Sequence, residues 1–442
     1  MKLFRYFIFF YILLQSHLAA KDDFIDSKFR NHFIIDSIKI KGNEITEDFV
    51  ILRELTFTVG DSVNLDILSY NQERLYSLRI FSYVKVFSAL ESNKTIIYIE
   101  VKEGWYIYPF PFLRLNHSSL KFASYGVYLR WKNFRGRNES IRATAAFGYD
   151  PYYRIDYYNP YLIEDEDIFF AFHSAYQKYQ NKSQRLLSYY NGDFDYTIFS
   201  NFFTIGKRLD RFNYLKLFLG YNYVKANVEP VSGVTASNTR IDRTSFLTLA
   251  YTYDTRDLIQ FPQRGFYGEA AFAHKGFGLN NINYNILLFD LRNYWNFYDD
   301  FVARERITYR HIAGSAIPYY DYSYFGYDEI VRGHSRDVRE GHNYLLTSVE
   351  LSYPIFKEWN VSVDLPIIPE RITSARIGMY LYLFADTGIT FMNNENITTR
   401  GFYSGYGVGI NMILLPYSGI KFEYAFDENM NGEFIIGTDF SL

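Results

Sequence analysis

The sequence contains no cysteine among its 442 residues. This absence excludes disulfides, thiol chemistry, cysteine-ligated metals and a lipid anchor on an N-terminal cysteine. Long apolar runs are also scarce, because beyond the first residues no stretch approaches the ~20 apolar residues that a spanning helix needs. The net charge is only -3, so the composition gives no reason to expect a nucleic-acid partner.

Aromatic residues, by contrast, are abundant. Tyrosine occurs 44 times and phenylalanine 42 times, whereas tryptophan occurs only 4 times. So much tyrosine is hard to bury in one soluble core. It suits a surface that is apolar in the middle and wet at both rims, as in the aromatic girdles of membrane barrels.

The first residues have the features of an export signal. Lys2 and Arg5 form a basic end, residues 6–14 are apolar, and Ala19 and Ala20 offer a small-residue cleavage site. This pattern predicts a signal peptide over residues 1–20, too short for a spanning helix. An uncleaved anchor is the alternative. The rest of the chain is then exported, and if it enters a membrane it enters as strands.

Residues 33–103 predict a small α+β domain. A strand ends at the turn pair Gly42-Asn43, and Thr46 is expected to cap a helix that runs to about Leu55. A longer helix over about 65–78 follows, with apolar residues near the helical period. Two strands, 84–87 and 95–101, complete the unit, which has the size of a small domain.

The order of turns and apolar positions in this unit resembles a POTRA domain; a generic ferredoxin-like module is the alternative. The positions that carry the resemblance are Gly42, Asn43, Gly60, Phe81 and Val84. In that family the domain lies in the periplasm and receives unfolded clients or lipoprotein partners. It does so by adding strands to its exposed sheet edge, a recurrent way of binding peptides.

From residue 104 to 442 the chain reads as short alternating strands, and no convincing amphipathic helix is found. In residues 374–388, for example, Leu381 and Leu383 share an apolar face while Arg376 and Asp386 lie on the opposite, charged face. A soluble sandwich also alternates, but strands of about 9–11 residues, a polar second face and an export signal favour a membrane barrel. We therefore expect a mainly β fold, a transmembrane antiparallel β-barrel of about 16 strands. The expected starts are near residues 107, 123, 140, 153, 167, 191, 213, 244, 266, 283, 301, 344, 376, 405, 419 and 433.

Four motifs in this half, taken in order, resemble the BamA/TamA-type outer-membrane insertase and translocator superfamily, also called the bacterial surface antigen family. The first is a strand and turn motif, with Asp254, Arg256, Asp257, Pro262 and Gly265. The others are the loop motif Val331, Arg332 and Gly333, then Phe384, Asp386 and Gly388, and finally the C-terminal strand with Ile436, Gly437, Phe440 and Leu442.

The resemblance implies that a long loop folds back into the barrel lumen and that its arginine contacts a strand wall. Strand parity independently points Phe384 and Asp386 into the lumen, so we expect Arg332 to face Asp386 as a bidentate pair. Gly333 would let the backbone turn there. The alternatives are a solvated loop arginine and a pair of purely structural value. His334 and His342 flank the motif and are expected to be solvated.

The last strand is expected to act as a sorting signal, as the closing strand, or as both. In the family the first and last strands meet in a weak seam, here about 107–115 and 433–442. Pro109 and Pro111 lack an N–H for a ladder, which fits poor pairing at the seam and equally a linker before the barrel. The chain departs from the family in ending in Leu442 rather than an aromatic residue. It also has room for only one POTRA domain and lengthens a turn at 356–374.

The sequence shows no enzyme signature: neither a nucleophile elbow nor a phosphate-binding loop is present, and no catalytic residue, cofactor or metal site is predicted. We expect an integral outer-membrane protein, with its POTRA domain in the periplasm, that inserts, assembles or translocates other polypeptides. The expected partners are unfolded outer-membrane or secreted clients, membrane lipids, and periplasmic lipoproteins or chaperones. A dedicated two-partner-type secretion pore is the first alternative, and a passive porin or structural barrel is another.

Overall fold

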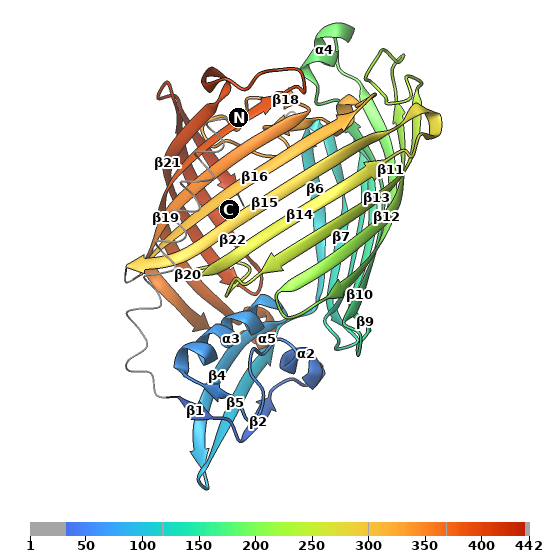
Figure 1. The fold of residues 1–442 in the computed structure, drawn as a ribbon. Coiled ribbons are helices and arrows are strands. Elements are labelled where there is room, and N and C mark those ends of the chain that lie inside the picture. The colour runs from blue at the N-terminus through green and yellow to red at the C-terminus, as the bar shows by residue number, and fades with distance from the viewer. Residues whose placement is uncertain (1–31, 117–118, 299, 368, 438–442) are drawn as a thin grey trace.

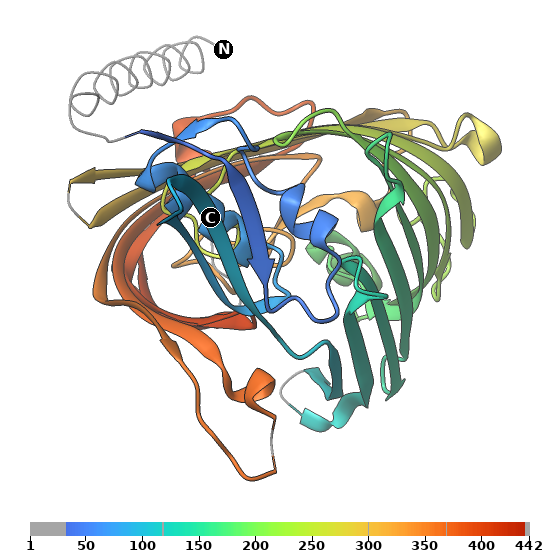
Figure 2. The ribbon, with the colours of Figure 1, turned by 90° about the horizontal axis from the view of Figure 1, so that it is seen from below.

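The computed structural model describes residues 32–116, 119–298, 300–367 and 369–437. A large β-barrel stands on a small α+β domain, which lies across one mouth of the barrel (Figures 1 and 2). We call this mouth the domain end and the opposite mouth the loop end. The predicted signal peptide, residues 1–20, lies outside the described residues. No helix in the described ranges is both long and apolar enough to cross a membrane.

The N-terminal domain is built on a three-stranded sheet in the order β2-β5-β4. β2 is parallel to β5, and β4 is antiparallel to it. Two helices accompany the sheet, and the short strands β1 and β3 pair separately. The elements are β1 (Phe33–Ile34), β2 (Ser37–Lys41), α2 (Asp48–Leu52), β3 (Ser62–Val63), α3 (Leu65–Ser77), β4 (Phe81–Glu91) and β5 (Lys94–Glu103).

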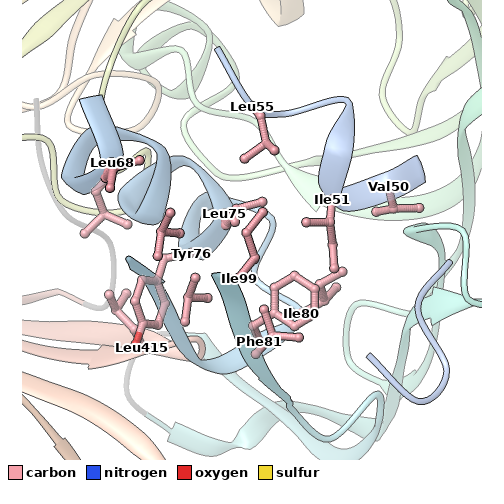
Figure 3. Packing of buried hydrophobic residues seen from close by; sticks show 14 of the residues in the cluster. Val50, Ile51, Leu55, Leu68, Leu75, Tyr76, Ile80, Phe81, Ile99 and Leu415 are labelled. Atoms are coloured by element: carbon pink, nitrogen blue, oxygen red, sulfur yellow. The ribbon is translucent and has the colours of Figure 1, made fainter. Parts of the chain in front are cut away.

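Apolar residues at helical spacing fix α3 onto this sheet. Leu68, Leu75 and Tyr76 are almost fully buried, and the Asn64 side chain caps the helix by accepting a hydrogen bond from the Ile67 amide at 3.0 Å. Figure 3 shows these side chains packed together with Leu415, which comes from a barrel strand. The domain and the barrel therefore share one apolar core.

Two local expectations for this domain were wrong. Thr46 does not cap the first helix: α2 follows Glu47, and the Thr46 hydroxyl instead donates to Glu103 at 2.6 Å. The helix also ends at Leu52 rather than near Leu55. The competing bond explains the difference, because a hydroxyl already engaged by a carboxylate does not serve the helix end. The expected single first strand is divided into β1 and β2.

The predicted POTRA positions have clear backbone or packing roles. Gly42 has φ +90, and a Cβ there would lie 2.0 Å from the Val101 carbonyl oxygen. Gly60 has φ +95, which also favours glycine. The side-chain amide of Asn43 donates to the Thr46 carbonyl at 2.9 Å, closing the turn. The remaining two positions, Phe81 and Val84, are buried in the domain core.

The barrel is a 16-stranded antiparallel sheet in which each strand pairs with its neighbours in the chain. The exception is the pairing of β16 with β19, because β17 and β18 form a separate hairpin. The barrel strands are β6 (Ile107–Asn116), β7 (Ser119–Phe134), β8 (Glu139–Gly148), β9 (Tyr152–Ile163), β10 (Ile168–Gln180), β11 (Asp195–Arg208), β12 (Asn213–Ala226), β13 (Ile241–Asp254), β14 (Gly265–Lys275), β15 (Tyr284–Tyr298), β16 (Phe301–Gly314), β19 (Asn343–Val361), β20 (Ala375–Phe391), β21 (Tyr403–Leu415), β22 (Ser418–Asp427) and β23 (Gly432–Gly437).

Alternation sorts the side chains of each strand between the outer surface and the lumen. In β20, Leu381 and Leu383 are exposed on the outside, whereas Tyr382, Phe384 and Asp386 are buried inside. This confirms the predicted fold class, a transmembrane-type antiparallel barrel after one α+β domain. Short helices do occur in the loops, where none was expected: α4 (Gln184–Tyr190), α5 (Glu370–Thr373), η1 (Leu279–Asn281), η2 (Tyr319–Asp321) and η3 (Thr399–Gly401).

Candidate functional site

The segment between β16 and β19 folds into the barrel instead of crossing over its rim. It contains η2 and the hairpin of β17 (Ser323–Phe325) with β18 (Arg339–Gly341). Residues 326–338 connect these two strands and carry the predicted loop motif. Val331 is 1% exposed and packs with Phe325, Tyr344 and Leu346. We call residues 315–342 the lumen loop.

Arg332 is 5% exposed and donates three hydrogen bonds to the carboxylate of Asp386 on β20. Its Nε lies 2.7 Å from Oδ2 and its Nη2 lies 2.6 Å from Oδ1. The Arg332 amide also donates to Oδ2 at 3.0 Å. Its guanidinium lies 3.9 Å from the ring centroid of Phe384. The structure therefore places the loop arginine and the wall aspartate together in the bidentate geometry that gives such pairs their strength.

Two further carboxylates meet the same guanidinium, and the sequence did not predict either. Arg332 Nη1 lies 2.6 Å from Glu350 on β19 and 2.9 Å from Glu423 on β22. Arg304 lies 3.9 Å from Glu350 and Lys421 lies 3.6 Å from Glu423. The cluster thus contains three cations and three carboxylates. We call these six residues the lumen cluster. Strand alternation puts both glutamates on the lumen face, but only the pairing of β19 to β22 brings them to one point.

Glycines make room for the loop against the wall. A Cβ on Gly405 of β21 would lie 1.6 Å from the Arg332 carbonyl oxygen, so no other residue fits without moving the loop. A Cβ on Gly388 would lie 2.8 Å from the Phe325 ring and 3.1 Å from Val331. Gly333 has φ +98, which explains the glycine in the motif. The loop backbone therefore packs directly against the strands and is not held by one ion pair alone.

The lumen loop also holds the last hairpin of the barrel. The Gly333 and Ser335 amides donate to Glu433 Oε1 on β23 at 2.7 and 3.0 Å. The Ser335 hydroxyl donates to the other oxygen of Glu433 at 2.7 Å. His334 bridges to Glu428 in the β22–β23 turn at 2.7 Å. The loop therefore contacts the edge strand directly.

His334 was expected to be solvated, and this expectation was wrong. The side chain is 8% exposed and lies between Asp337, 2.8 Å from Nδ1, and Glu428, 2.7 Å from Nε2. Burial alone lowers the pKa of His334, but hydrogen bonds and charge from the two carboxylates outweigh it, so the pKa lies above its usual value. Sequence spacing did not show this because Glu428 is distant in the chain.

The strands β6 and β23 are the two ends of the sheet, and no ladder joins their described residues. Pro109 and Pro111 lie inside β6, opposite Leu129 and Val127, so they do not form a linker before the barrel. The Tyr106 carbonyl accepts a bond from the Lys132 amide at 2.7 Å, which turns the even-numbered backbone groups toward β7.

The odd-numbered groups of β6, including the positions of both prolines, therefore face the free edge. That edge lacks two N–H donors that a closing strand would use. This loss of donors weakens pairing between the first and last strands.

The C-terminal motif is described only up to residue 437. Phe434 and Ile436 point outward and are 58% and 62% exposed. A Cβ on Gly437 would lie 2.4 Å from the Lys421 side chain. Phe440 and Leu442 lie outside the described residues, and their proposed part in sorting stays a prediction.

The strand and turn motif around residue 257 lies at the domain end, away from the lumen loop. Arg256 bonds to Asp254 at 2.6 Å, and Asp257 Oδ1 accepts from the Leu258 and Gln263 amides at 2.8 and 3.0 Å. These bonds fix the turn, in which the Pro262 carbonyl accepts from Arg304 Nε at 3.2 Å and Gly265 has φ +111.

This turn is a docking site for the N-terminal domain. The Tyr70 hydroxyl of α3 donates to the Thr255 carbonyl at 3.0 Å, and the Ser77 hydroxyl accepts from the Ile259 amide at 2.9 Å. Leu258 and Phe261 belong to the apolar core that the domain shares with the barrel. Sequence comparison of the motif gave no hint of this contact, because the partner is about 180 residues away in the chain.

Ion pairs reinforce the docking on both sides of the mouth. Glu54 of the domain lies 2.7 Å from Arg208 on β11, and Glu73 of α3 lies 2.7 Å from Arg376 on β20. Burial raises the pKa of Glu54, but Arg208 and Arg74 outweigh it, so the pKa lies below its usual value. The domain is thus clamped to strands on opposite parts of the barrel wall (Figure 2).

Within the described ranges, no three histidine, aspartate or glutamate side chains converge as a metal site. The lumen cluster is already matched in charge, so its carboxylates are engaged by cations of the chain itself. The arrangement holds a loop in place, and among the described residues one edge of β6 and one edge of β23 are unpaired.

Comparison with known proteins identifies the family. The model of the Omp85 superfamily domain matches residues 133–440, and the POTRA model, a surface antigen variable number repeat, matches residues 33–104. The chain belongs to the Omp85 superfamily. It carries one POTRA domain, and the predicted resemblance is confirmed. The search of curated proteins found no match.

Solved structures share this Omp85 fold at low sequence identity. BamA from Haemophilus ducreyi lacking POTRA domains 1-3 aligns with TM-score 0.53 and 16% identity, over 92% of this chain and 83% of that one. CdiB from Escherichia coli aligns with TM-score 0.54 and 10% identity, over 91% and 75%. CdiB from Acinetobacter baumannii aligns with TM-score 0.51 and 15% identity, over 91% and 72%.

Proposed function

We propose that this Omp85 protein inserts or translocates other polypeptides at the outer membrane by opening between β6 and β23. One edge of β6 pairs with no described residue and lacks two N–H donors because of Pro109 and Pro111, and this observation carries the proposal. An unpaired edge in a membrane is costly, because backbone groups there have no water to bond. Such an edge is therefore ready to accept a client strand.

The lumen loop supplies control over this opening. It bonds to Glu433 on β23, and through the lumen cluster it is fixed to β19, β20 and β22. Because the loop is bonded to the last strands, it holds β23 in position, while the facing edge of β6 pairs with no described residue. Release of the loop would let the last hairpin swing away from β6.

The POTRA domain is the proposed receptor for clients, and it would lie in the periplasm. Its sheet order, β2-β5-β4, leaves one edge of β2 unpaired among the described residues, so an extended peptide can add there as a strand. Periplasmic lipoproteins or chaperones would use the same edge. The activity needs no covalent chemistry and no cofactor, since the strand edges themselves assist the client.

Depletion of the protein, followed by quantitative proteomics of outer-membrane and secreted fractions, tests the proposal. Loss of several unrelated barrels indicates insertion. Loss of one secreted or surface-exposed protein, with the barrels unchanged, indicates a dedicated secretion pore. If neither fraction changes, client handling is contradicted and a passive porin becomes the better interpretation. A plasmid copy of the intact gene serves as the control for restoration.

A further inference from the structure

A row of charged side chains crosses four neighbouring strands on the lumen wall. Arg130 of β7 stands opposite Arg142 of β8, Arg142 opposite Asp156 of β9, and Asp156 opposite His173 of β10. Arg154 lies two residues from Asp156 on the same face of β9. We call these five residues the basic row.

The row contains more positive charge than its one carboxylate can match. Asp156 is bonded to Arg154 at 2.6 Å and to His173 at 2.7 Å, and Arg142 reaches it only at 3.7 Å. Arg130 forms no ion pair with any described residue. Like charges placed directly opposite each other destabilise a sheet. The repulsion between Arg130 and Arg142 lowers the stability of the sheet. The two arginines therefore point to a function for the charge rather than to a role in stability.

The row faces open space. It lines a cavity of about 700 Å³, whose wall also includes Phe202, Phe218 and Lys216. The carboxylate of Glu269 is engaged by Lys216 at 3.0 Å and is therefore not available to neutralise the row. Stacking of His173 on Phe202, with centroids 4.5 Å apart, gives the same surface an aromatic character.

Two further cavities adjoin this one along the lumen. At the domain end the cavity of the basic row shares Tyr214 and Asp254 with a cavity of about 340 Å³ that the POTRA arginines Arg53 and Arg74 also line. Toward the loop end it shares Arg154 and His173 with a cavity of about 330 Å³. In the strand order, β7–β14 lie across the barrel from β19–β22, so these cavities lie opposite the lumen cluster.

We propose that the basic row binds the carboxylates of an acidic client segment that enters the lumen in an extended form before it leaves between β6 and β23. The inference deepens the proposed function and rests on it for the identification of the ligand as a polypeptide. Arginine forms strong bidentate bonds with carboxylates, and the aromatic surface suits the apolar side chains between them. The row would thus select clients, or client segments, by negative charge.

Binding to the purified full chain in detergent tests this directly. Fluorescein-labelled decaglutamate is titrated and followed by anisotropy, with decalysine as the opposite-charge control. The double variant Arg130→Gln/Arg142→Gln is expected to bind decaglutamate about tenfold more weakly or worse, since it loses two charge-assisted contacts. Arg243→Gln removes one positive charge from an exposed position on β13 and should bind as the wild type does.

Two further measurements separate site loss from misfolding. Arg142→Lys keeps the charge but cannot form a bidentate bond, so its binding should lie between that of the wild type and that of Arg142→Gln. The double variant should unfold at the same temperature as the wild type or a higher one, because a repulsion is removed. A purely structural row predicts the opposite, a lower unfolding temperature with binding unchanged.

Three results overturn the proposal: no binding of decaglutamate by the wild type, equal binding of decalysine, or binding unaffected by the double variant. Free glutamate that competes at an equal carboxylate concentration would assign the row to small anions instead of a polypeptide. Because the assay uses purified protein, it is independent of the depletion experiment. Binding in the absence of any proteome change would leave the site standing and remove the proposed function.

Discussion

Arg332 of the lumen loop and Asp386 of β20 form a buried pair in which both carboxylate oxygens are bonded, at 2.6 and 2.7 Å. The pair lies against β21, where the backbone of Gly405 is so close to Arg332 that a side chain would not fit between strand and loop. Its other bonds lead to β19 and β22. A single side chain therefore ties the loop to the strands that precede the free edge at β23.

Removal of the Asp386 charge should weaken the attachment of the lumen loop to the strands. Asp386→Asn leaves a buried guanidinium with one charged partner fewer, and breaking a buried pair typically costs about 3–5 kcal/mol. We expect a clearly lower unfolding temperature in detergent. Asp328→Asn, in the same loop but in a more exposed pair with Lys182, should cost no more than about 1 kcal/mol. Equal effects of the two changes would contradict the assigned role of Asp386.

Reversal of both charges should not restore the loop. A simple pair predicts that Arg332→Asp with Asp386→Arg recovers what either single change destroys. The structure predicts otherwise, because the new acid would face Glu350 and Glu423, which now lie 2.6 and 2.9 Å from the guanidinium. Like charges at that distance in a buried site repel strongly. The double variant should therefore be no more stable than the worse single variant, as measured by heat-induced unfolding.

Gly405→Ala tests the steric seat of the loop. The added methyl group would lie 1.6 Å from the Arg332 carbonyl oxygen, so the loop must move away from β21. Trypsin should then cut after Arg332, a bond that is buried in the wild type. Mass spectrometry of the fragments identifies the cut. Gly192→Ala, in an open part of another loop, should leave the bond protected. Protection in both variants would show that the seat is looser than the geometry indicates.

The contribution of His334 should depend on pH. Because its folded pKa is raised above its unfolded value, its stabilisation is complete below the unfolded pKa of about 6.5 and is lost as pH rises through the folded pKa. The wild type should therefore exceed His334→Gln in unfolding temperature by more at about pH 5.5 than at about pH 9. Glu428 and Asp337 face the ring. Burial raises the pKa of Glu428, but the bonds that its carboxylate accepts outweigh this effect, so the pKa lies below its usual value. A pH-independent difference would mean that the bridges act without charge.

Local patterns predicted most of the fold but only part of the site. Alternation located all sixteen strands and placed Asp386 inside, since a strand's faces follow from its own residues. Glu350, Glu423 and Gly405 escaped notice because their meeting point depends on register across β19 to β22. His334 was misjudged for the same reason. The docking of the POTRA domain likewise depends on contacts between residues far apart in the chain, which no local pattern contains.

The most direct test of the account is a reversible lock on the free edges. Because the chain has no cysteine, pairs of cysteines can be scanned along β6 and β23 without background. Leu217→Cys/Leu249→Cys, at directly opposed positions of β12 and β13, gives a matched lock inside the closed sheet. Client delivery is measured by the proteomics of both fractions, before and after reduction. We predict that a β6–β23 bridge blocks delivery, that reduction restores it, and that the β12–β13 bridge has no effect. Full delivery with β6 and β23 covalently joined would contradict opening between these strands.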